Sequence, residues 1–243
     1  MATSDDGRTI RDAVQVLDHA SVPDGTRLPD GSIGIYYVNA SDGGVWLARL
    51  SGGVATPVGP IAVDGVTRPL GVVDPDATLL ANQRVRLVYL QNIQGTAGAA
   101  PTRAICVAES GDGQQFHQTG TALSLGAGST ETDPSVTQLR DGTWLMAISR
   151  GQQTEIARSV DGIIFALGET LSFGGVPEVT TLDDGRVRLY VCADGIESYV
   201  SADAGRSWGR EGTVVPRGTL GRNLVCDPSR IAGTNVFVFK TAS

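Results

Sequence analysis

The sequence is poor in cysteine, histidine and aromatic residues, and each scarcity narrows the range of functions. Its 243 residues include three cysteines and two histidines, and only 5% are aromatic. Because Cys106, Cys192 and Cys226 show no CxxC spacing, a zinc site is not supported. No phosphate loop or His-rich metal site is evident either, so we expect no metal and no cofactor. At most one disulfide can form among three cysteines. We expect all three to be buried as small apolar side chains.

Long apolar runs and basic segments are also missing. No run approaches the roughly 20 apolar residues that a membrane helix needs, and no secretory signal is visible at the N-terminus. The net charge is −7, and no segment is rich in Lys or Arg. A nucleic acid or an anionic membrane is therefore not an expected partner. We expect a monomer, and the sequence leaves its compartment open.

What the sequence does contain is glycine, at 32 residues, and an internal repeat. Five segments each place a proline beside an acidic or serine residue, ahead of a turn and an apolar strand. They are Val22–Val38, Asp74–Tyr89, Asp133–Ile148, Val176–Tyr190 and Asp227–Phe239. Alternating runs within them indicate β-strands, and pairs such as Asp184-Gly185 indicate tight turns.

A second motif follows most of these segments. It reads Ser110–Phe116, Ser159–Phe165 and Ser201–Trp208, and it resembles the Asp box of sialidase-like propellers. Ser4–Ile10 fits the same pattern. The resemblance implies that Asp6, Asp112, Asp161 and Asp203 are structural turn residues on the rim of a propeller, away from its ligand-binding funnel.

Together the two motifs predict a four-stranded repeat, which is one propeller blade. We therefore expect one all-β domain over residues 1–243, a five-bladed β-propeller of antiparallel blades. Residues 1–20 complete the blade begun at 226–243, with Ala13–Leu17 as its outer strand. A long β-sandwich is the rival architecture, but it does not explain five equivalent proline-anchored starts.

Carboxylates gather at those starts. The inner strands of a propeller converge on its channel, so acidic residues beside the prolines are expected to meet there. They are Asp24, Asp74, Asp76, Asp133, Glu178 and Asp227. Function is one reason to keep such a cluster, whereas an Asp before a proline can also simply start a turn. Glu178 stands where other blades carry shorter side chains, and a long acid in a walled funnel suits a general acid.

This arrangement is similar to that of five-bladed glycoside hydrolases of the arabinanase and β-xylosidase type. The resemblance implies that Asp24 activates water, Glu178 protonates the leaving oxygen, and Asp133 orients and tunes Glu178. Inversion requires the acid and the base to stand roughly 6.5–9.5 Å apart. Asp133 precedes its proline whereas Asp24 and Glu178 follow theirs, so the three need not share a face. Asp74 is a competing base.

We expect a carbohydrate or another small molecule in the central funnel. Besides Asp74, Asp76 and Asp227, the candidate contacts are Arg68, Arg150, Arg222 and His19. The alternative is a non-catalytic glycan-binding or scaffold propeller, which short blades and scarce aromatic residues favour. An isomerase or lyase on the same scaffold also fits. Acids that face each other across an open funnel would support the enzyme, whereas acids bonded to backbone would support the alternative.

Overall fold

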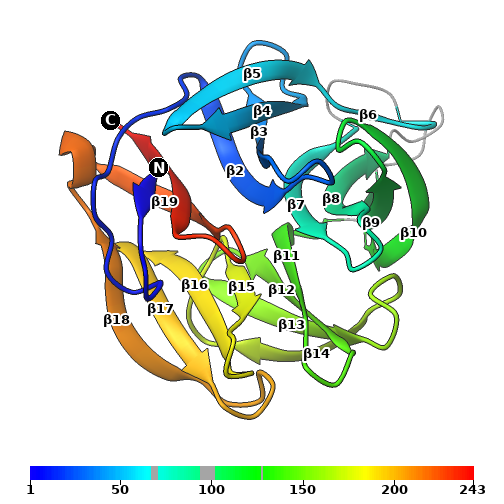
Figure 1. Cartoon of the computed structure of the whole chain (residues 1–243). Coiled ribbons are helices and arrows are strands. Elements are labelled where there is room, and N and C mark those ends of the chain that lie inside the picture. The colour runs from blue at the N-terminus through cyan, green and yellow to red at the C-terminus, as the bar shows by residue number, and fades with distance from the viewer. Residues whose placement is uncertain (67–70, 94–101, 127) are drawn as a thin grey trace.

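The computed structural model describes residues 1–66, 71–93, 102–126 and 128–243. They form five β-sheets arranged around a common centre, which confirms the predicted five-bladed propeller (Figure 1). Outside the strands, the described residues contain a single short 3-10 turn, Thr219–Gly221. In these ranges no helix has the length and apolar character needed to cross a membrane.

Each blade begins with an inner strand at the centre and proceeds outward. Blade 1 contains β2 (Ala20–Arg27), β3 (Ile33–Asn39), β4 (Val45–Ser51) and β5 (Val54–Pro60). Blade 2 contains β7 (Val73–Leu79), β8 (Val85–Ile93), β9 (Thr102–Ser110) and β10 (Gln115–Leu125). Blade 3 contains β11 (Thr132–Gln138), β12 (Trp144–Arg150), β13 (Gln153–Ser159) and β14 (Ala166–Leu171). Blade 4 contains β15 (Glu178–Thr181), β16 (Val187–Ala193), β17 (Gly195–Ser201) and β18 (Gly209–Pro216).

Blade 5 joins the two ends of the chain. Its strands are β19 (Leu224–Arg230), β20 (Val236–Ala242) and β1 (Ala2–Thr3), and β1 pairs antiparallel with β20. Figure 1 shows the N- and C-termini on this blade. The predicted closure by the N-terminal segment is therefore confirmed.

The expected outer strand at Ala13–Leu17 is wrong in detail, because blade 5 is a three-stranded sheet. The N-terminal segment does run beside β1, but it bonds to it only at two places. Thr3 exchanges backbone bonds with Arg11, and Met1 exchanges them with Val14. The segment departs from the regular ladder between these points, so it covers the edge without forming a strand.

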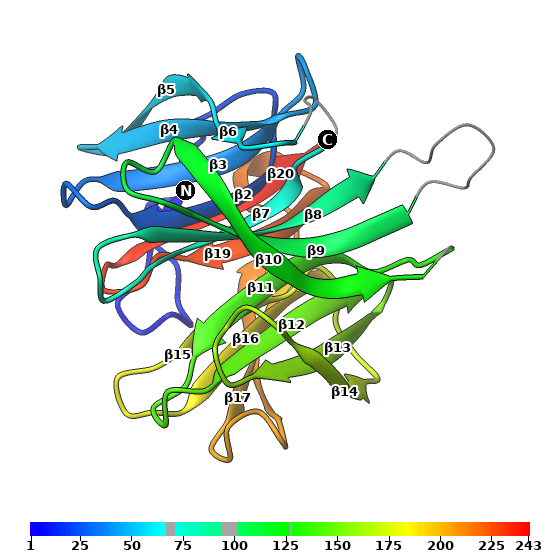
Figure 2. The same cartoon turned by 90° about the vertical axis from the view of Figure 1, so that its right-hand side faces the viewer.

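A short extra strand connects blades 1 and 2. After β5 the chain forms β6 (Ala62–Val63), which pairs in parallel with β10 of the next blade (Figure 2). The sheet of blade 2 therefore has five strands, and its outer edge is covered.

The apolar core lies between neighbouring blades. Apolar side chains on both faces of a strand contribute to it, so one blade packs against the blade before it and the blade after it. On β8, Leu87 and Tyr89 belong to a cluster shared with blade 1, whereas Val88 and Leu90 belong to one shared with blade 3. Successive side chains of a strand point to opposite faces. Each middle strand therefore binds its blade to both neighbours.

Four Ser-x-Asp turns repeat one set of hydrogen bonds. In the turn of blade 2 the hydroxyl of Ser110 donates to Asp112, whose Oδ1 accepts the N–H groups of Gln114 and Gln115 at 2.8 and 2.9 Å. The same pattern recurs at Asp6, Asp161 and Asp203. Because each turn follows the end of a third strand, all four lie on the face opposite the prolines. We call these two faces the turn face and the proline face.

The turns also join the blades, because each offers backbone carbonyls to the blade before it. The Tyr36 hydroxyl donates to Gly113 O at 2.7 Å, and Tyr190 donates to Gly7 O at 2.8 Å. Arg86 donates to Gly162 O at 3.2 Å, and Arg158 to Gly205 O at 3.2 Å. The four turns that we expected to be structural therefore also form contacts between blades.

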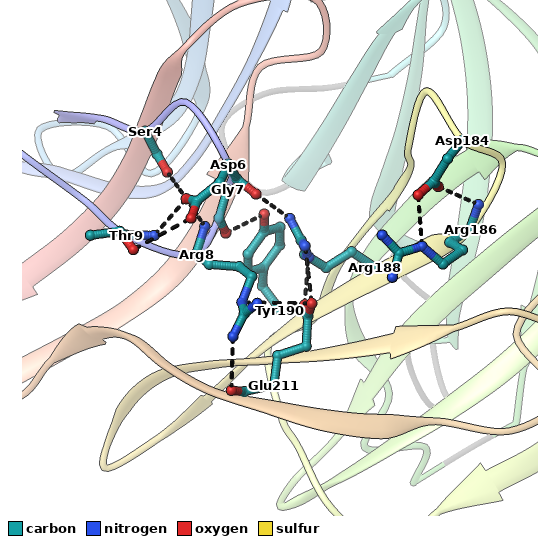
Figure 3. Close-up of polar contacts among 10 residues, drawn as sticks. All are labelled: Ser4, Asp6, Gly7, Arg8, Thr9, Asp184, Arg186, Arg188, Tyr190 and Glu211. Carbon is teal, nitrogen blue, oxygen red and sulfur yellow. Dashed lines mark hydrogen bonds and ion pairs between the residues drawn. The ribbon is translucent and has the colours of Figure 1, made fainter.

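The turn formed by the N-terminus is held most extensively (Figure 3). Arg188 of blade 4 donates to Asp6 O at 2.6 Å and forms an ion pair with Glu211 at 2.6 Å. Both side chains are buried, at 6% and 9% exposure. Nearby, Arg186 pairs with Asp184 at 2.7 Å, but these side chains are 47% and 52% exposed. The two pairs differ in their access to water, and Arg188 in addition donates to Asp6 O.

The expectation for the cysteines is wrong for two of them. Cys192, near the end of β16, and Cys226, in β19, form a disulfide with a Cα–Cα distance of 5.1 Å. Their repeats stand side by side in space although 34 residues separate them in sequence. Cys106 is free and buried, as expected.

We predict that Arg188→Met lowers the free energy of unfolding by about 3 kcal/mol. It removes the bond to Asp6 O and leaves the carboxylate of Glu211 with the longer contact to Arg8 at 3.7 Å. Arg186→Met is the matched control two residues earlier, and it should change the free energy by less than about 0.5 kcal/mol. Urea unfolding followed by circular dichroism measures both. Equal effects of the two substitutions would contradict a role for the buried pair.

Candidate functional site

The residue before each proline has an unusual backbone conformation. The φ angles of Val22, Asp74, Asp133, Val176 and Asp227 all lie between 43° and 50°. This region is uncommon for residues other than glycine, and especially for β-branched valine. In four blades the inner strand also shifts register at this point. In these four blades the proline therefore marks a β-bulge, which redirects the side chains on either side of it, and in blade 4 the inner strand begins directly after its proline.

The side chain after each proline points toward the neighbouring blade. We call these five residues the clasp ring; they are Asp24, Asp76, Ser135, Glu178 and Ser229. All are buried, with exposures between 1% and 8%. Each accepts the backbone N–H of the residue that follows the ring member of the next blade. The donors are Ala77 to Asp24 (2.6 Å), Val136 to Asp76, Val179 to Ser135 (3.0 Å), Arg230 to Glu178 (3.3 Å) and Gly25 to Ser229 (3.1 Å).

Hydroxyl groups complete the ring. Ser229 donates to Asp24 Oδ1 at 2.7 Å, and Ser135 donates to Glu178 Oε2 at 2.9 Å. Two residues further along the strands, Thr26 accepts the Leu79 N–H at 3.1 Å and Thr137 accepts the Thr181 N–H at 3.0 Å. The inner strands are therefore tied together by side chains, since they share no β-ladder.

Three members of the ring form an inner acid cluster. Asp24, Asp76 and Glu178 each place one carboxylate oxygen within 4.8 Å of the others. Burial is the main cause that raises their pKa values, to about 6 for Asp24 and well above the usual range for Asp76 and Glu178. The negative charge of Asp24 adds to the rise at both of the other two. Asp24 and Glu178 thus lie together with Asp76, bonded to backbone, and do not face each other across an open funnel.

Asp133 lies in a separate outer layer, toward the proline face, with Asp74 and Asp227. Asp227 accepts the Val22 N–H at 3.1 Å, and Asp74 accepts the Asp133 N–H at 3.4 Å. Lys240 stands 3.6 Å from Asp227 and donates to Ser21 at 2.8 Å. The bulge at each proline is what places these acids in a layer different from that of the clasp ring.

Within the outer layer, Asp74 and Asp227 accept a backbone N–H from the next blade, whereas the side chain of Asp133 bonds to Thr132 of its own strand. The equivalent bond in its blade would take the Val176 N–H, but Ser149 accepts that group instead at 3.0 Å. Asp133 and Asp74 are half-buried, whereas Asp227 is buried. Burial, together with the negative charge of Asp74, raises the pKa of Asp133 to about 7. Burial also raises the pKa of Asp74.

The channel is narrow at the level of the acids. A cavity of about 20 Å³ is lined by both acid layers and the prolines. Toward the turn face the channel widens to about 330 Å³, between Thr26, Arg27, Thr78 and Arg230. The inner acid cluster lines both spaces, so it forms the partition between them.

A third cavity, of about 200 Å³, lies between the N-terminal segment and blade 5. It brings His19 and Arg222 together with Lys240, and it shares Pro23 with the narrow part of the channel. His19 is exposed and stands 3.7 Å from Asp18, and Arg222 donates to Ser243 at 2.8 Å.

Two other predicted contact residues are placed differently. Arg150 pairs with Glu155 at 2.9 Å and lines neither end of the channel. Arg68 lies outside the described residues. The predicted set is therefore divided among the clasp ring, the outer layer, the side cavity and the rim.

Sequence reasoning missed Ser135, Ser229 and Lys240. The two serines stand at the same place in the repeat as Asp24, Asp76 and Glu178, so their alignment was the available signal. Lys240 stands 3.6 Å from Asp227 of the outer layer, and it lies on the second strand of its blade. No motif distinguishes it in the sequence.

No family model and no curated protein match this sequence. Several solved structures share its fold. A family-43 endo-arabinanase from Bacillus licheniformis superposes with a TM-score of 0.65 at 14% identity, over 99% of this chain and 96% of that one. A fructofuranosidase from Schwanniomyces occidentalis complexed with fructose gives 0.68 at 14% identity, over 91% of this chain and 52% of that one. A Dyadobacter fermentans protein of unknown function gives 0.62 at 16% identity, over 99% and 79%.

The fold is therefore the one shared by five-bladed glycoside hydrolases, as the sequence predicted. A microbial sialidase also resembles it, with a TM-score of 0.55 at 15% identity over 79% of this chain and 46% of that one. The chain spans about half the length of the fructofuranosidase and the sialidase, and nearly all of the arabinanase. At these identities the likeness concerns the fold alone.

We predict that the protein becomes less stable as the pH rises from about 5 to 7.5. Several buried acids, Asp24, Asp133 and Glu178 among them, have a raised pKa when folded. In this window the folded state therefore binds more protons than the unfolded state, and the free energy of unfolding falls. Asp133→Asn should flatten this slope, on the order of 2 kcal/mol over the window. Thermal unfolding in buffers with a chelator measures it.

The aspartates of the Ser-x-Asp turns do not contribute above pH 5, the lower limit of this pH range. Backbone N–H groups lower the pKa of Asp161 to about 2, so turns of this kind lose stability only at much lower pH. A slope that is the same in the wild type and in Asp133→Asn would show that Asp133 does not titrate in this range.

Proposed function

We propose that this chain is a carbohydrate-active propeller that hydrolyses a glycosidic bond at its proline face, with Asp133 as the general acid and Asp74 as the partner carboxylate. The observation that carries the proposal is the pairing of two half-buried carboxyl groups at that end of the channel. Of the two, Asp133 accepts no backbone hydrogen bond from the next blade, because Ser149 accepts the Val176 N–H. Its side chain bonds to Thr132 of its own strand, and its remaining hydrogen-bonding capacity is available to a ligand.

The electrostatics of the pair suit two different roles. A carboxyl group with a pKa of about 7 is about half protonated at neutral pH, so a large fraction of the molecules can give a proton to a leaving oxygen. When Asp133 is protonated, its neighbour Asp74 would carry the negative charge of the pair. That carboxylate would activate water or stabilise a cationic transition state. Lys240 balances part of this charge through Asp227.

The side cavity supplies room for the sugar beyond the pair. It adjoins the channel at Pro23, and it offers Lys240, Arg222 and His19 as donors to hydroxyl groups. The names of two fold neighbours, an endo-arabinanase and a fructofuranosidase, support glycosides as the substrate class. Asp24 and Glu178 are the competing pair, and their backbone bonds count against them.

A second candidate function is non-catalytic glycan binding. The observation in its favour is that all three acids of the inner cluster are buried and bonded to backbone. A cavity of about 20 Å³ at the level of the acids also leaves little room for a reacting ring. Under this function the side cavity alone would bind the ligand.

A panel of aryl glycosides, including arabinosides and fructosides, tests the hydrolase. We expect turnover by the wild type, with a loss of about 10²–10⁴-fold in kcat for Asp133→Asn and a comparable loss for Asp74→Asn. Leaving groups of low pKa need less acid catalysis, so they should lessen the effect of Asp133→Asn. Circular dichroism establishes that each variant is folded.

Glu178→Gln separates the competing assignments. Loss of activity in Glu178→Gln with full activity in Asp133→Asn would overturn our assignment of the acid. No turnover of any glycoside, together with saturable glycan binding that Arg222→Ala weakens, would establish the second function instead.

A further inference from the structure

The turn-face end of the channel is a cavity that the proposed hydrolysis does not use, and we call it the vestibule. It measures about 330 Å³ and lies on the side of the inner acid cluster opposite the Asp74–Asp133 pair. The inner strands of all five blades line it, namely β2, β7, β11, β15 and β19 (Figure 1). A cavity of this size is at the lower end of the range that holds small-molecule ligands, roughly 300–1,000 Å³.

One residue of the vestibule, Arg230, departs from the repeat. The residue two places after the proline is small or apolar in the other four blades: Gly25, Ala77, Val136 and Val179. Arg230 is half-buried, and its Nε is fully buried without an acceptor. Within the described part of the chain its guanidinium takes part in no hydrogen bond or ion pair. Because a buried N–H of a charged group is costly without an acceptor, a ligand for Arg230 is expected.

A second arginine, Arg27 of the neighbouring blade 1, lines the same cavity. It donates to Gly233 O at 2.9 Å, and among the described residues it forms no ion pair. Acids are not scarce, because the chain has 26 Asp and Glu against 19 Lys and Arg. Arginines of the outer strands do pair with them, as Arg158 does with Glu169 at 3.0 Å. Two arginines without a carboxylate beside one cavity favour an anionic ligand.

Threonine hydroxyls also line the vestibule. The residue three places after the proline is a threonine in four blades: Thr26, Thr78, Thr137 and Thr180. Thr26 and Thr137 each accept an N–H from the next blade. The hydroxyls of Thr78 and Thr180 make no hydrogen bond within the ranges that the structure describes. A hydroxyl both donates and accepts, so these two can bind the hydroxyl groups of a ligand.

The floor of the vestibule is the inner acid cluster, whose charge would oppose an anion if all three acids were ionised. Burial raises the pKa of Asp24 to about 6, and it raises the pKa values of Asp76 and Glu178 well above their usual range. Asp76 and Glu178 are therefore largely protonated at a pH where an exposed carboxyl group is ionised. The floor carries less negative charge than its three carboxyl groups suggest.

We propose that the vestibule binds a small hydroxylated anion, a sugar acid or a sugar phosphate, with its carboxylate or phosphate on Arg230 and Arg27 and its hydroxyl groups on Thr78 and Thr180. Carboxylate and phosphate share the paired oxygens that a guanidinium binds with two parallel N–H bonds. The inner acid cluster separates this site from the proline face. The anion is thus a second ligand, and its binding does not depend on the proposed hydrolysis.

Calorimetric titration of the wild type with glucuronate, glucose 6-phosphate and glucose tests the chemistry. We expect one site per chain for an anionic sugar, and binding of glucose weaker by about 10-fold or more, because glucose lacks the group that the arginines bind. The tighter of the two anions distinguishes a carboxylate ligand from a phosphate ligand. Glucose binding as tightly as both anions would overturn the assigned chemistry, and no binding of either anion would overturn the site.

Arg230→Met locates the site. It should weaken binding of the anion by about 10-fold or more. It should not lower the Tm of the ligand-free protein, because the guanidinium makes no bond that the substitution removes. Arg206→Met is the matched control, the same change at an exposed arginine of the blade 4 turn, and it should bind the anion as the wild type does. Circular dichroism establishes that both variants are folded.

Thr180→Val is a second variant, which keeps the shape of the side chain and removes its hydroxyl. It should weaken binding of the anion by about 3- to 10-fold, the effect of one lost hydrogen bond. Full affinity in both Arg230→Met and Thr180→Val would overturn the site. Binding retained in Arg230→Met but lost in Arg222→Met would place the anion in the side cavity and overturn the assignment.

Discussion

The propeller depends on one hydrogen bond repeated five times around the ring. Five blades share no β-ladder at the axis, so their inner strands need another link. The side chain after each proline supplies it by accepting an N–H from the next blade. The positive φ before each proline costs of order 1–3 kcal/mol, and it is tolerated because the bulge it produces aims that side chain sideways. Strain in each blade is thus exchanged for contact between blades.

The hydrogen bonds between the blades determine which acids are available for chemistry. An acceptor of a backbone bond needs only a lone pair, so serine and carboxylate serve equally well in the clasp ring. Three of its five positions nevertheless carry acids, and the charge they bring exceeds what the clasp requires. The outer layer differs, because the role of acceptor for the next blade passes from Asp133 to Ser149. Asp133 does not hold the next blade, so its carboxyl group is the one that could act on a ligand.

The fold could be predicted from the sequence because blades repeat, and the prolines mark every repeat. The position of Ala13–Leu17 could not, because edge pairing depends on the bonds at Thr3 and Met1 rather than on apolar alternation. Nor could the destination of Asp24 and Glu178 be predicted. Besides Ser229 and Ser135, their partners are backbone N–H groups of other blades, which any residue type can supply. The division of the acids into two layers depends on the bulges, which one sequence does not reveal.

The first turn of the chain has a consequence for how the molecule assembles. Ala2 pairs with Phe237, so β1 must wait for the last strand before it has a partner. Blades 1 to 4 can each collapse from contacts that are local in sequence, whereas blade 5 requires closure of a loop almost as long as the chain. During synthesis β1 therefore has no partner strand until β20, at Val236–Ala242, has left the ribosome. Ring closure should then be the final step of folding, with an open arc of blades before it.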